Sequence, residues 1–146
     1  MAPALAELAA ALGKVHAERG LAIAVEAPAE LAYPLERGDF LEIAGNLADN
    51  ACKWARHEVR IAASAWLDAG WRRPGLVLAV SDDGPGIPAD ERARVRHRGV
   101  RLDERVPGQG LGLAMVDEII KVYGGSFELG ASPAGGLMAV ARLPGA

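Results

Sequence analysis

Hydrophobic and polar residues alternate along the chain with two periods, one typical of helices and one typical of strands. Helices are predicted over about residues 3–18, 39–56 and 111–123, with a short additional helix over about 88–95. The first is Ala-rich and is predicted to end near Gly20, because alanine costs no side-chain entropy in a helix. Asp39 is the predicted N-cap of the second, and Gly124 and Gly125 are predicted to stop the third.

Strands are predicted over about residues 21–26, 59–65, 76–80, 126–132 and 137–143. In the second of these, apolar residues at every other position indicate a half-buried strand. The run at 76–80 is apolar on both faces, which is typical of a central strand. Turn residues at 68–75 and 133–136 are predicted to join neighbouring strands as hairpins. The predicted fold class is α+β, a two-layer α/β sandwich with a mixed, mostly antiparallel sheet and helices on one face.

Composition restricts the class of protein further. The chain has 146 residues, of which 51% are hydrophobic and 24% are charged, so its length suits one folded domain and not two. The formal net charge of −3 does not favour nucleic-acid binding. No apolar run approaches the roughly 18 residues of a membrane helix, the N-terminus does not resemble a signal peptide, and Cys52 has no partner for an internal disulfide. We therefore expect a soluble, cytosolic single domain over residues 1–146.

The second predicted helix carries a stripe of polar side chains formed by Glu42, Asn46, Asn50 and Lys53. At about 100° per residue, these four side chains fall within a stripe about 80° wide. One interpretation is an ordinary amphipathic helix with a solvated polar face. However, asparagine is a poor helix former, whereas an amide oxygen suits the shell of a magnesium ion and a lysine suits a phosphate. The stripe is therefore a candidate site for a cation and phosphates.

A cluster of turn residues, DDGPGIP over 82–88, directly follows the apolar run at 76–80. Asp, Gly and Pro form turns whatever the function, so a simple turn is one interpretation. The functional interpretation is that Asp82 accepts a hydrogen bond from an amino group such as adenine N6. Gly84 and Gly86 would then allow the backbone to approach a ring closely.

A glycine-rich segment, Gly108 to Leu113, leads into the third predicted helix. Its backbone N–H groups and the helix N-terminus form a candidate anion site, although a flexible hinge has the same composition. The segment is not the dinucleotide-binding fingerprint, because Leu113 replaces the last glycine. It is not a Walker loop either, because no Gly-Lys-Ser/Thr follows.

An arginine-rich stretch over residues 92–105 separates the second and third motifs. Its first three arginines follow each other at a spacing of two, which spreads them around a helix, and we interpret them as solvated. Arg98 and Arg101 lie nearer the glycines and are candidates for phosphate contacts.

The order of these motifs resembles the N, G1 and G2 boxes of the GHKL ATP-binding superfamily. Within it, residues 20–143 are similar to the catalytic, ATP-binding domain of bacterial sensor histidine kinases, in particular the PhoQ-like group. The common F box is absent and VRHRGVRLDERV takes its place, as in that group. The resemblance implies the sandwich fold, ATP and Mg²⁺ as cofactors, a leading helix over 1–19 and an ATP lid over 96–110.

The resemblance also implies a role for each residue of the motifs. The residues expected to bind adenine are Asp82, Gly84, Gly86, Ile87 and Trp54. Asp82 is expected to accept a hydrogen bond from the adenine amino group, and Trp54 stands where the family usually has tyrosine. The residues expected to hold Mg²⁺ are Asn50, Asn46 and Gln109. The residues expected to contact the phosphates are Lys53, Arg98 or Arg101, and the backbone amides of Gly110, Leu111, Gly112 and Leu113. Gly108 and Gln109 are also expected to bind the nucleotide. The residues expected to be catalytic are Asn46, Lys53 and Arg101.

The reaction implied by the resemblance is transfer of the γ-phosphoryl group of ATP to a histidine on a separate dimerisation domain, and onward transfer to a response regulator. None of His16, His57 and His97 lies in an H box, so the phosphoacceptor domain is expected to be absent from this chain. The parent protein is expected to be an inner-membrane sensor with this domain in its cytoplasmic part, and the isolated domain is expected to be a monomer.

Two alternatives stay open. One is a GHKL-type ATPase of the gyrase, Hsp90 or MutL kind, although the glutamate that those enzymes use would align with Asn46, which accepts no proton from water. The other is a non-catalytic nucleotide-binding or interaction module that keeps the fold without the transfer.

Overall fold

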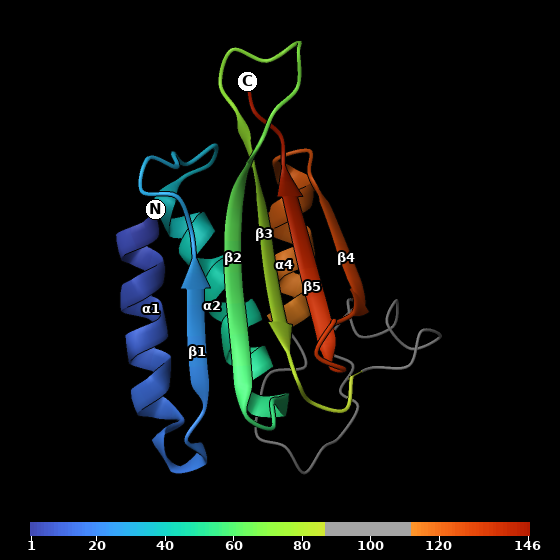
Figure 1. The fold of residues 1–146 in the computed structure, drawn as a ribbon. Coiled ribbons are helices and arrows are strands. Elements are labelled where there is room, and N and C mark those ends of the chain that lie inside the picture. The colour runs from blue at the N-terminus through green and yellow to red at the C-terminus, as the bar shows by residue number, and fades with distance from the viewer. Residues whose placement is uncertain (87–111) are drawn as a thin grey trace.

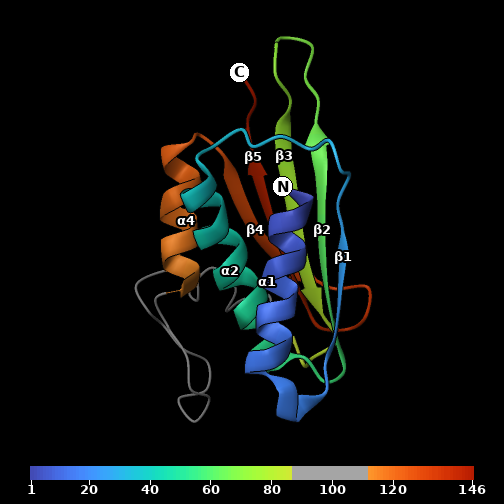
Figure 2. The ribbon, with the colours of Figure 1, turned by 90° about the vertical axis from the view of Figure 1, so that its left-hand side faces the viewer.

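The computed structural model describes residues 1–86 and 112–146 and has two layers, a five-stranded sheet and a row of helices. Figures 1 and 2 show the helices of these residues on one face of the sheet. The helical segments are α1 (Ala2–Val15), the 3₁₀ turn η1 (Ala17–Arg19), α2 (Arg37–Trp54) and α4 (Gly112–Val122). The strands are β1 (Ala22–Glu26), β2 (Glu58–Trp66), β3 (Gly75–Asp82), β4 (Ser126–Ala131) and β5 (Leu137–Leu143). The predicted α+β sandwich is confirmed.

The sheet has the strand order β1-β2-β3-β5-β4. Strands β1 and β2 are parallel, and the other neighbouring pairs are antiparallel. Parallel neighbours need a crossover, which α2 provides by passing over the sheet between them. The predicted connections at 68–75 and 133–136 join β2 to β3 and β4 to β5 as antiparallel neighbours. β3 lies in the middle of the sheet, as its apolar run predicts.

The core lies between the sheet and the helices, because each element turns one apolar face inward. Phe40, Ile43 and Leu47 recur every three to four residues along α2 and are at most 2% exposed. They belong to one cluster with Ile61 of β2 and Leu78 of β3, which are fully buried. Burial of each such side chain contributes about 1.5–3 kcal/mol, so α2 is a main element of the core.

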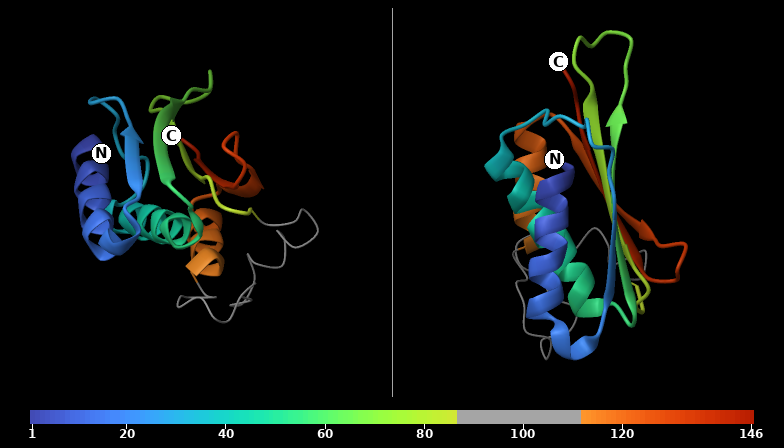
Figure 3. Two further views of the ribbon diagram at one scale, coloured as in Figure 1. Left: turned by 60° about the horizontal axis from the view of Figure 1, so that its bottom comes forward. Right: turned by 60° about the vertical axis from the view of Figure 1, so that its left-hand side comes forward.

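The opposite face of the sheet is less deeply buried. Val77 and Ala79 of β3 point to that face and alternate with the buried residues of the same strand. Figure 3 shows no helix over this face in the part of the chain that the structure describes. The strand is therefore central within the sheet but packed under helices on one side only.

Two helix boundaries differ from the sequence prediction. Helix α2 begins directly after its N-cap Glu36, so the prediction of an Asp39 N-cap is wrong. Asp39 instead lies in the first turn, where its carboxylate accepts a hydrogen bond from the hydroxyl of Tyr123. A carboxylate is favourable there because the free N–H groups give a helix N-terminus a partial positive charge. Helix α1 ends at Val15, and η1 then leads to Gly20, whose φ is 60°.

The helices within residues 1–86 and 112–146 include none that is long and apolar enough to cross a lipid bilayer. The short helix predicted over 88–95 lies outside these described residues.

Candidate functional site

One end of the sandwich gathers parts of all three sequence motifs. The C-terminal half of α2, the C-terminal end of β3 and the N-terminus of α4 lie at this end, at the bottom of Figure 1. Helix α2 packs against both β3 and α4, which brings these three ends together. The candidate residues Asn50, Asp82 and Gly112, which are far apart in the sequence, therefore come from one region of the fold.

The two asparagines of α2 lie one turn apart and are half-buried. The side-chain nitrogen of Asn46 donates to the backbone oxygen of Glu42 at 2.7 Å and lies 3.4 Å from the carboxylate of the same residue. These contacts satisfy the amide nitrogen within the helix, so the amide oxygen is the group that Asn46 offers to a cation. Together with Asn50 in the same stripe, the donors fit a hard cation whose remaining ligands are water and phosphate oxygens. Within the described residues, no group of three or more His, Cys, Asp or Glu side chains is placed to hold a metal ion.

Lys53, at the end of the polar stripe, is paired with Asp49 one turn earlier. The ammonium nitrogen of Lys53 lies 3.0 Å from Oδ2 of Asp49, and Nε2 of His16 lies 2.9 Å from Oδ1 of the same carboxylate. Burial raises the pKa of Asp49, but the hydrogen bonds from His16 and Lys53 outweigh burial and hold the pKa below its ordinary value. Nothing in the sequence distinguishes Asp49 from a solvated acidic residue, because His16 is 33 residues away.

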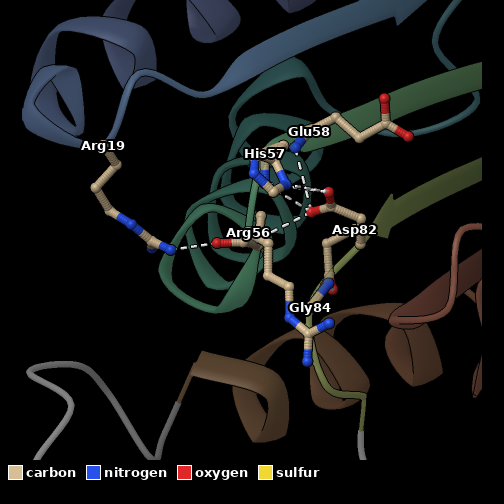
Figure 4. Close-up of polar contacts among 8 residues, drawn as sticks. Arg19, Arg56, His57, Glu58, Asp82 and Gly84 are labelled. Atoms are coloured by element: carbon tan, nitrogen blue, oxygen red, sulfur yellow. Dashed lines mark hydrogen bonds and ion pairs between the residues drawn. The ribbon is translucent and has the colours of Figure 1, made fainter.

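Arg19 of η1 caps the C-terminus of α2. Its guanidinium donates to the backbone oxygens of Cys52, Lys53 and Ala55, at 2.7 Å in the case of Lys53. Figure 4 shows the side chain reaching from the leading segment to the end of the helix. The last carbonyls of a helix have no partner within it, and a cation is favourable at that end. The leading segment therefore fixes the turn that carries Lys53.

Asp82 ends β3 and is only 3% exposed. Its Oδ1 accepts hydrogen bonds from the backbone N–H groups of Gly84 at 2.8 Å and Leu137 at 3.4 Å. Burial raises the pKa of this carboxyl, and the two backbone hydrogen bonds oppose the shift only in part. A carboxylate has more acceptor sites than these two bonds use, so Asp82 retains the capacity to accept from a ligand.

Three glycines lie around Asp82 where the backbone leaves no room or no suitable conformation for a side chain. A Cβ on Gly84 would lie 2.2 Å from the backbone oxygen of Trp54, and a Cβ on Gly136 would lie 2.2 Å from Oδ1 of Asp82. Gly86 has a φ of 75°, which residues with a side chain rarely adopt. Gly84 thus brings the end of β3 close to the end of α2, a backbone contact that the sequence does not predict. Gly136, in the β4–β5 turn, is a further part of the site that no sequence motif indicates.

Asp83, next to Asp82, ties the α2–β2 connection to the end of β3. Its Oδ1 accepts from the backbone N–H groups of Arg56, His57 and Glu58 at 2.8, 3.0 and 3.2 Å, and Figure 4 shows these three residues around the end of the strand. Burial raises the pKa of Asp83, but these N–H groups lower it to about 2. The second aspartate of the motif is therefore used by the fold itself.

The remaining candidates divide into two groups. Trp54 is half-buried at the end of α2, and Gly112 and Leu113 begin α4 and are buried. The others, which lie outside the described residues together with the stretch 96–110, are Ile87, Arg98, Arg101, Gly108, Gln109, Gly110 and Leu111.

This chain matches one protein-family model and is similar in sequence to two sensor proteins. Residues 36–146 match the family model of histidine kinase-, DNA gyrase B-, and HSP90-like ATPase. The chain is 46% identical over 125 residues to the sensor protein kinase CarS of Pseudomonas aeruginosa, a match that covers 85% of this chain and 26% of CarS. It is 40% identical over 136 residues to the sensor protein PhoQ of Escherichia coli (strain K12), covering 93% of this chain and 27% of PhoQ. The chain thus spans about a quarter of the length of these relatives.

Solved structures show the same architecture. Full-length ShkA in complex with AMPPNP matches with a TM-score of 0.79 and 30% identity, over 97% of this chain and 29% of ShkA. The mycobacterial sensor histidine kinase MprB matches with a TM-score of 0.76 and 25% identity, over 98% of this chain and 94% of that one. Both similarities extend over nearly the whole of this chain.

Proposed function

Because this chain belongs to the family of histidine kinase-, DNA gyrase B- and HSP90-like ATPases, we propose that it binds ATP with Mg²⁺ and donates the γ-phosphoryl group to a histidine of a separate dimerisation domain. The observation that carries the proposal is the gathering of Asn50, Lys53 and Asp82 at one end of the sandwich, beside the N-terminus of α4. The similarity to sensor kinases favours a histidine as the acceptor. We further propose that the whole protein is a membrane sensor that passes the phosphoryl group to a response regulator, with residues 1–19 as a leading helix and 96–110 as an ATP lid.

Asp82 is the proposed adenine-binding residue. The N–H groups of Gly84 and Leu137 hold its Oδ1, so the carboxylate is oriented before a ligand arrives. We propose that Oδ2 accepts a hydrogen bond from the exocyclic amino group of adenine. An acceptor in the protein at this position favours adenine over a base that carries a carbonyl in place of the amino group. The residues proposed to complete the adenine pocket are Gly84, Gly86, Ile87 and Trp54.

The amide oxygens of Asn50, Asn46 and Gln109 are the proposed Mg²⁺ ligands. When bound, the metal ion would neutralise charge on the phosphates. Lys53 adds a point charge one turn from Asn50, and the N-terminus of α4 adds the backbone N–H groups that phosphate favours. The residues proposed to contact the phosphates are Lys53, Arg98 or Arg101, and the backbone amides of Gly110, Leu111, Gly112 and Leu113, and Gly108 and Gln109 are proposed as further nucleotide-binding residues.

The acceptor imidazole is assigned to another domain, because none of His16, His57 and His97 lies in an H box. His16 contacts Asp49 and its side chain is 13% exposed, while Nδ1 of His57, whose side chain is 87% exposed, lies 3.4 Å from Asp83. The acceptor nitrogen forms a bond to the γ-phosphorus as the bond from that phosphorus to the bridging oxygen breaks and ADP leaves. The part that this chain plays is to hold the phosphates in position and to neutralise their charge.

Hydrolysis as the main activity has less support from the site. Activation of water needs a proton acceptor, and the side chain at the relevant position of α2 is the carboxamide of Asn46. Glu42, one turn earlier, faces the amide nitrogen of Asn46 at 3.4 Å. We therefore expect slow ATP hydrolysis when no acceptor domain is present.

Calorimetric titration with a non-hydrolysable ATP analogue, with and without Mg²⁺, tests the nucleotide site. We expect a dissociation constant in the micromolar to millimolar range (about −8 to −4 kcal/mol) that depends on Mg²⁺. Asn50→Ala is expected to remove the Mg²⁺ dependence and leave thermal unfolding unchanged, and unaltered affinity in this variant would contradict the metal assignment.

Incubation with radiolabelled ATP and the dimerisation domain of a similar sensor kinase tests the transfer. Label on the acceptor histidine is the expected result. Nucleotide binding without any label would favour the non-catalytic module, and no binding by the folded chain would overturn the whole proposal.

A further inference from the structure

The segment that precedes β1 contacts α2 at the lysine proposed to bind phosphate. Arg19 donates to the backbone oxygen of Lys53 at 2.7 Å, across 34 residues of sequence. His16 lies 2.9 Å from Oδ1 of Asp49, and Oδ2 of that carboxylate lies 3.0 Å from the ammonium nitrogen of Lys53. The same short segment, residues 16–19, therefore restrains both the backbone and the side chain of Lys53.

The backbone restraint follows from the way α2 ends. The oxygen of Ala51 accepts the N–H of Ala55 at 2.8 Å, which closes the last turn of the helix. Nη1 of Arg19 donates to the next two carbonyls, of Cys52 and Lys53, and Nη2 donates to that of Ala55. A guanidinium is a planar fork whose two terminal nitrogens bond oxygens in a fixed relative position, which a lysine ammonium does not reproduce.

The side-chain restraint combines the Lys53–Asp49 ion pair with the contact from His16 to the same carboxylate, and its exposure is limited. The side chains of His16, Asp49 and Lys53 are 13%, 30% and 18% exposed. Charges at this depth are screened less by salt than charges on an open surface. Lys53 has a flexible stem, so a partner that holds its ammonium group decides where its charge lies.

We infer that Arg19 and His16 are positioning residues for phosphate recognition, which hold Lys53 in place for the phosphates of the nucleotide. The inference rests on the proposed function, in which Lys53 contacts phosphate. The adenine pocket also includes Trp54 at the end of α2, but its hydrogen-bond acceptor is Asp82, whose partners come from the turn after β3 and from β5. Loss of the restraint is therefore expected to weaken phosphate binding much more than adenine binding.

A double-mutant cycle tests this inference. Arg19→Ala is expected to weaken binding of the non-hydrolysable ATP analogue with Mg²⁺ about tenfold, a typical coupling between distinct parts of a protein. Binding of adenosine, which has no phosphates, is expected to change less than about twofold when followed by chemical-shift titration at millimolar concentration. In a Lys53→Met background, Arg19→Ala is expected to add less than about twofold, because the residue through which it acts is gone.

Further variants keep the test decisive. Arg60→Ala is the matched control, because Arg60 makes an exposed ion pair with Glu26 at 3.2 Å, and it is expected to change neither ligand's affinity. Arg19→Lys, which keeps the charge without the fork, is expected to recover part of the lost affinity. If thermal unfolding shows that Arg19→Ala does not fold, His16→Ala replaces it, with an expected loss of about threefold for the ATP analogue that also requires Lys53.

The outcomes separate the inference from the function on which it rests. An equal loss of affinity for the ATP analogue and for adenosine would overturn the inference, and so would a loss that persists in the Lys53→Met background. Either result would mean that Arg19 supports the fold in general. Failure of the folded wild-type chain to bind the ATP analogue would instead overturn the proposed function.

Discussion

Two connections at opposite ends of β3 have similar compositions and different environments (Figure 1). The β2–β3 connection over 68–75 and the turn that begins at 82–86 are both rich in Asp, Gly and Pro. In the first, Asp68 accepts the N–H of Gly70 at 3.1 Å beside Leu67, which is 77% exposed. In the second, Asp82 makes the same kind of contact with the N–H of Gly84 at 2.8 Å but is 3% exposed.

The comparison shows that turn composition does not distinguish a simple connection from a candidate site. The distinguishing property is burial, because a carboxylate removed from water raises the free energy of the fold unless hydrogen bonds compensate it. At the surface end, the aspartate accepts a hydrogen bond within its own turn. At the buried end, glycines, backbone N–H groups and the end of α2 enclose the aspartate, which is the environment in which functional carboxylates are found.

The largest expected difference between the two ends is in stability. Gly136→Ala is expected to lower the free energy of unfolding by about 3 kcal/mol, because its Cβ would lie 2.2 Å from Oδ1 of Asp82 and 2.7 Å from the nitrogen of Gly84. Gly70→Ala, whose Cβ would approach nothing nearer than Asp68 at 3.7 Å, is expected to change it by less than about 1 kcal/mol. Urea unfolding at neutral pH measures both, and equal values would remove the structural basis of the comparison.

The next effect concerns ligand binding. Asp82→Asn is expected to weaken binding of the ATP analogue about 100-fold, because an amide does not reproduce a carboxylate that accepts from several donors at once. Asp68→Asn is the matched control and is expected to stay within about twofold of wild type. Calorimetry measures both affinities, and a comparable loss in the two variants would exclude Asp82 from the adenine site.

A smaller effect on the free energy of unfolding, which depends on pH, is expected at Asp83. Its pKa is lowered from 3.8 to about 2, so its contribution to stability is present above pH 4 and is lost as the pH falls towards 2. Asp83→Asn is expected to cost about 1.5 kcal/mol at neutral pH, since three charge-assisted hydrogen bonds weaken, and to cost little near pH 2. Denaturant unfolding between pH 2 and 7 measures the difference between the two proteins. A difference that does not decrease as the pH falls would contradict the stabilising role of the Asp83 carboxylate.

The smallest expected effect is at the surface end. Trp66 and Trp71 pack edge to face with ring centroids 4.9 Å apart. Trp71→Ala is expected to lower the free energy of unfolding by about 1 kcal/mol and to leave affinity for the ATP analogue unchanged. Thermal unfolding and calorimetry check the two parts, and a loss of nucleotide affinity would show that the two ends of β3 are coupled.

Much of the fold is predictable because its signals are local. The helix predicted over 111–123 corresponds to α4 (Gly112–Val122), and the predicted terminal hairpin corresponds to β4 and β5. The start of α2 was not predictable in the same way. Asp39 fits the preference for an N-cap, but the helix begins earlier, and the carboxylate of Asp39 contacts Tyr123 of a distant segment.

The periods of the helices and strands and the order of the three motifs can be read from the sequence, because these depend on residues only a few positions apart. Which polar groups serve the site depends on the tertiary structure. Asp82 contacts the N–H of Leu137 across 55 residues, and Arg19 contacts the end of α2 across 33 to 36. A hydrogen bond depends on the distance and angle of its two groups in space, which the fold sets and a linear pattern does not contain.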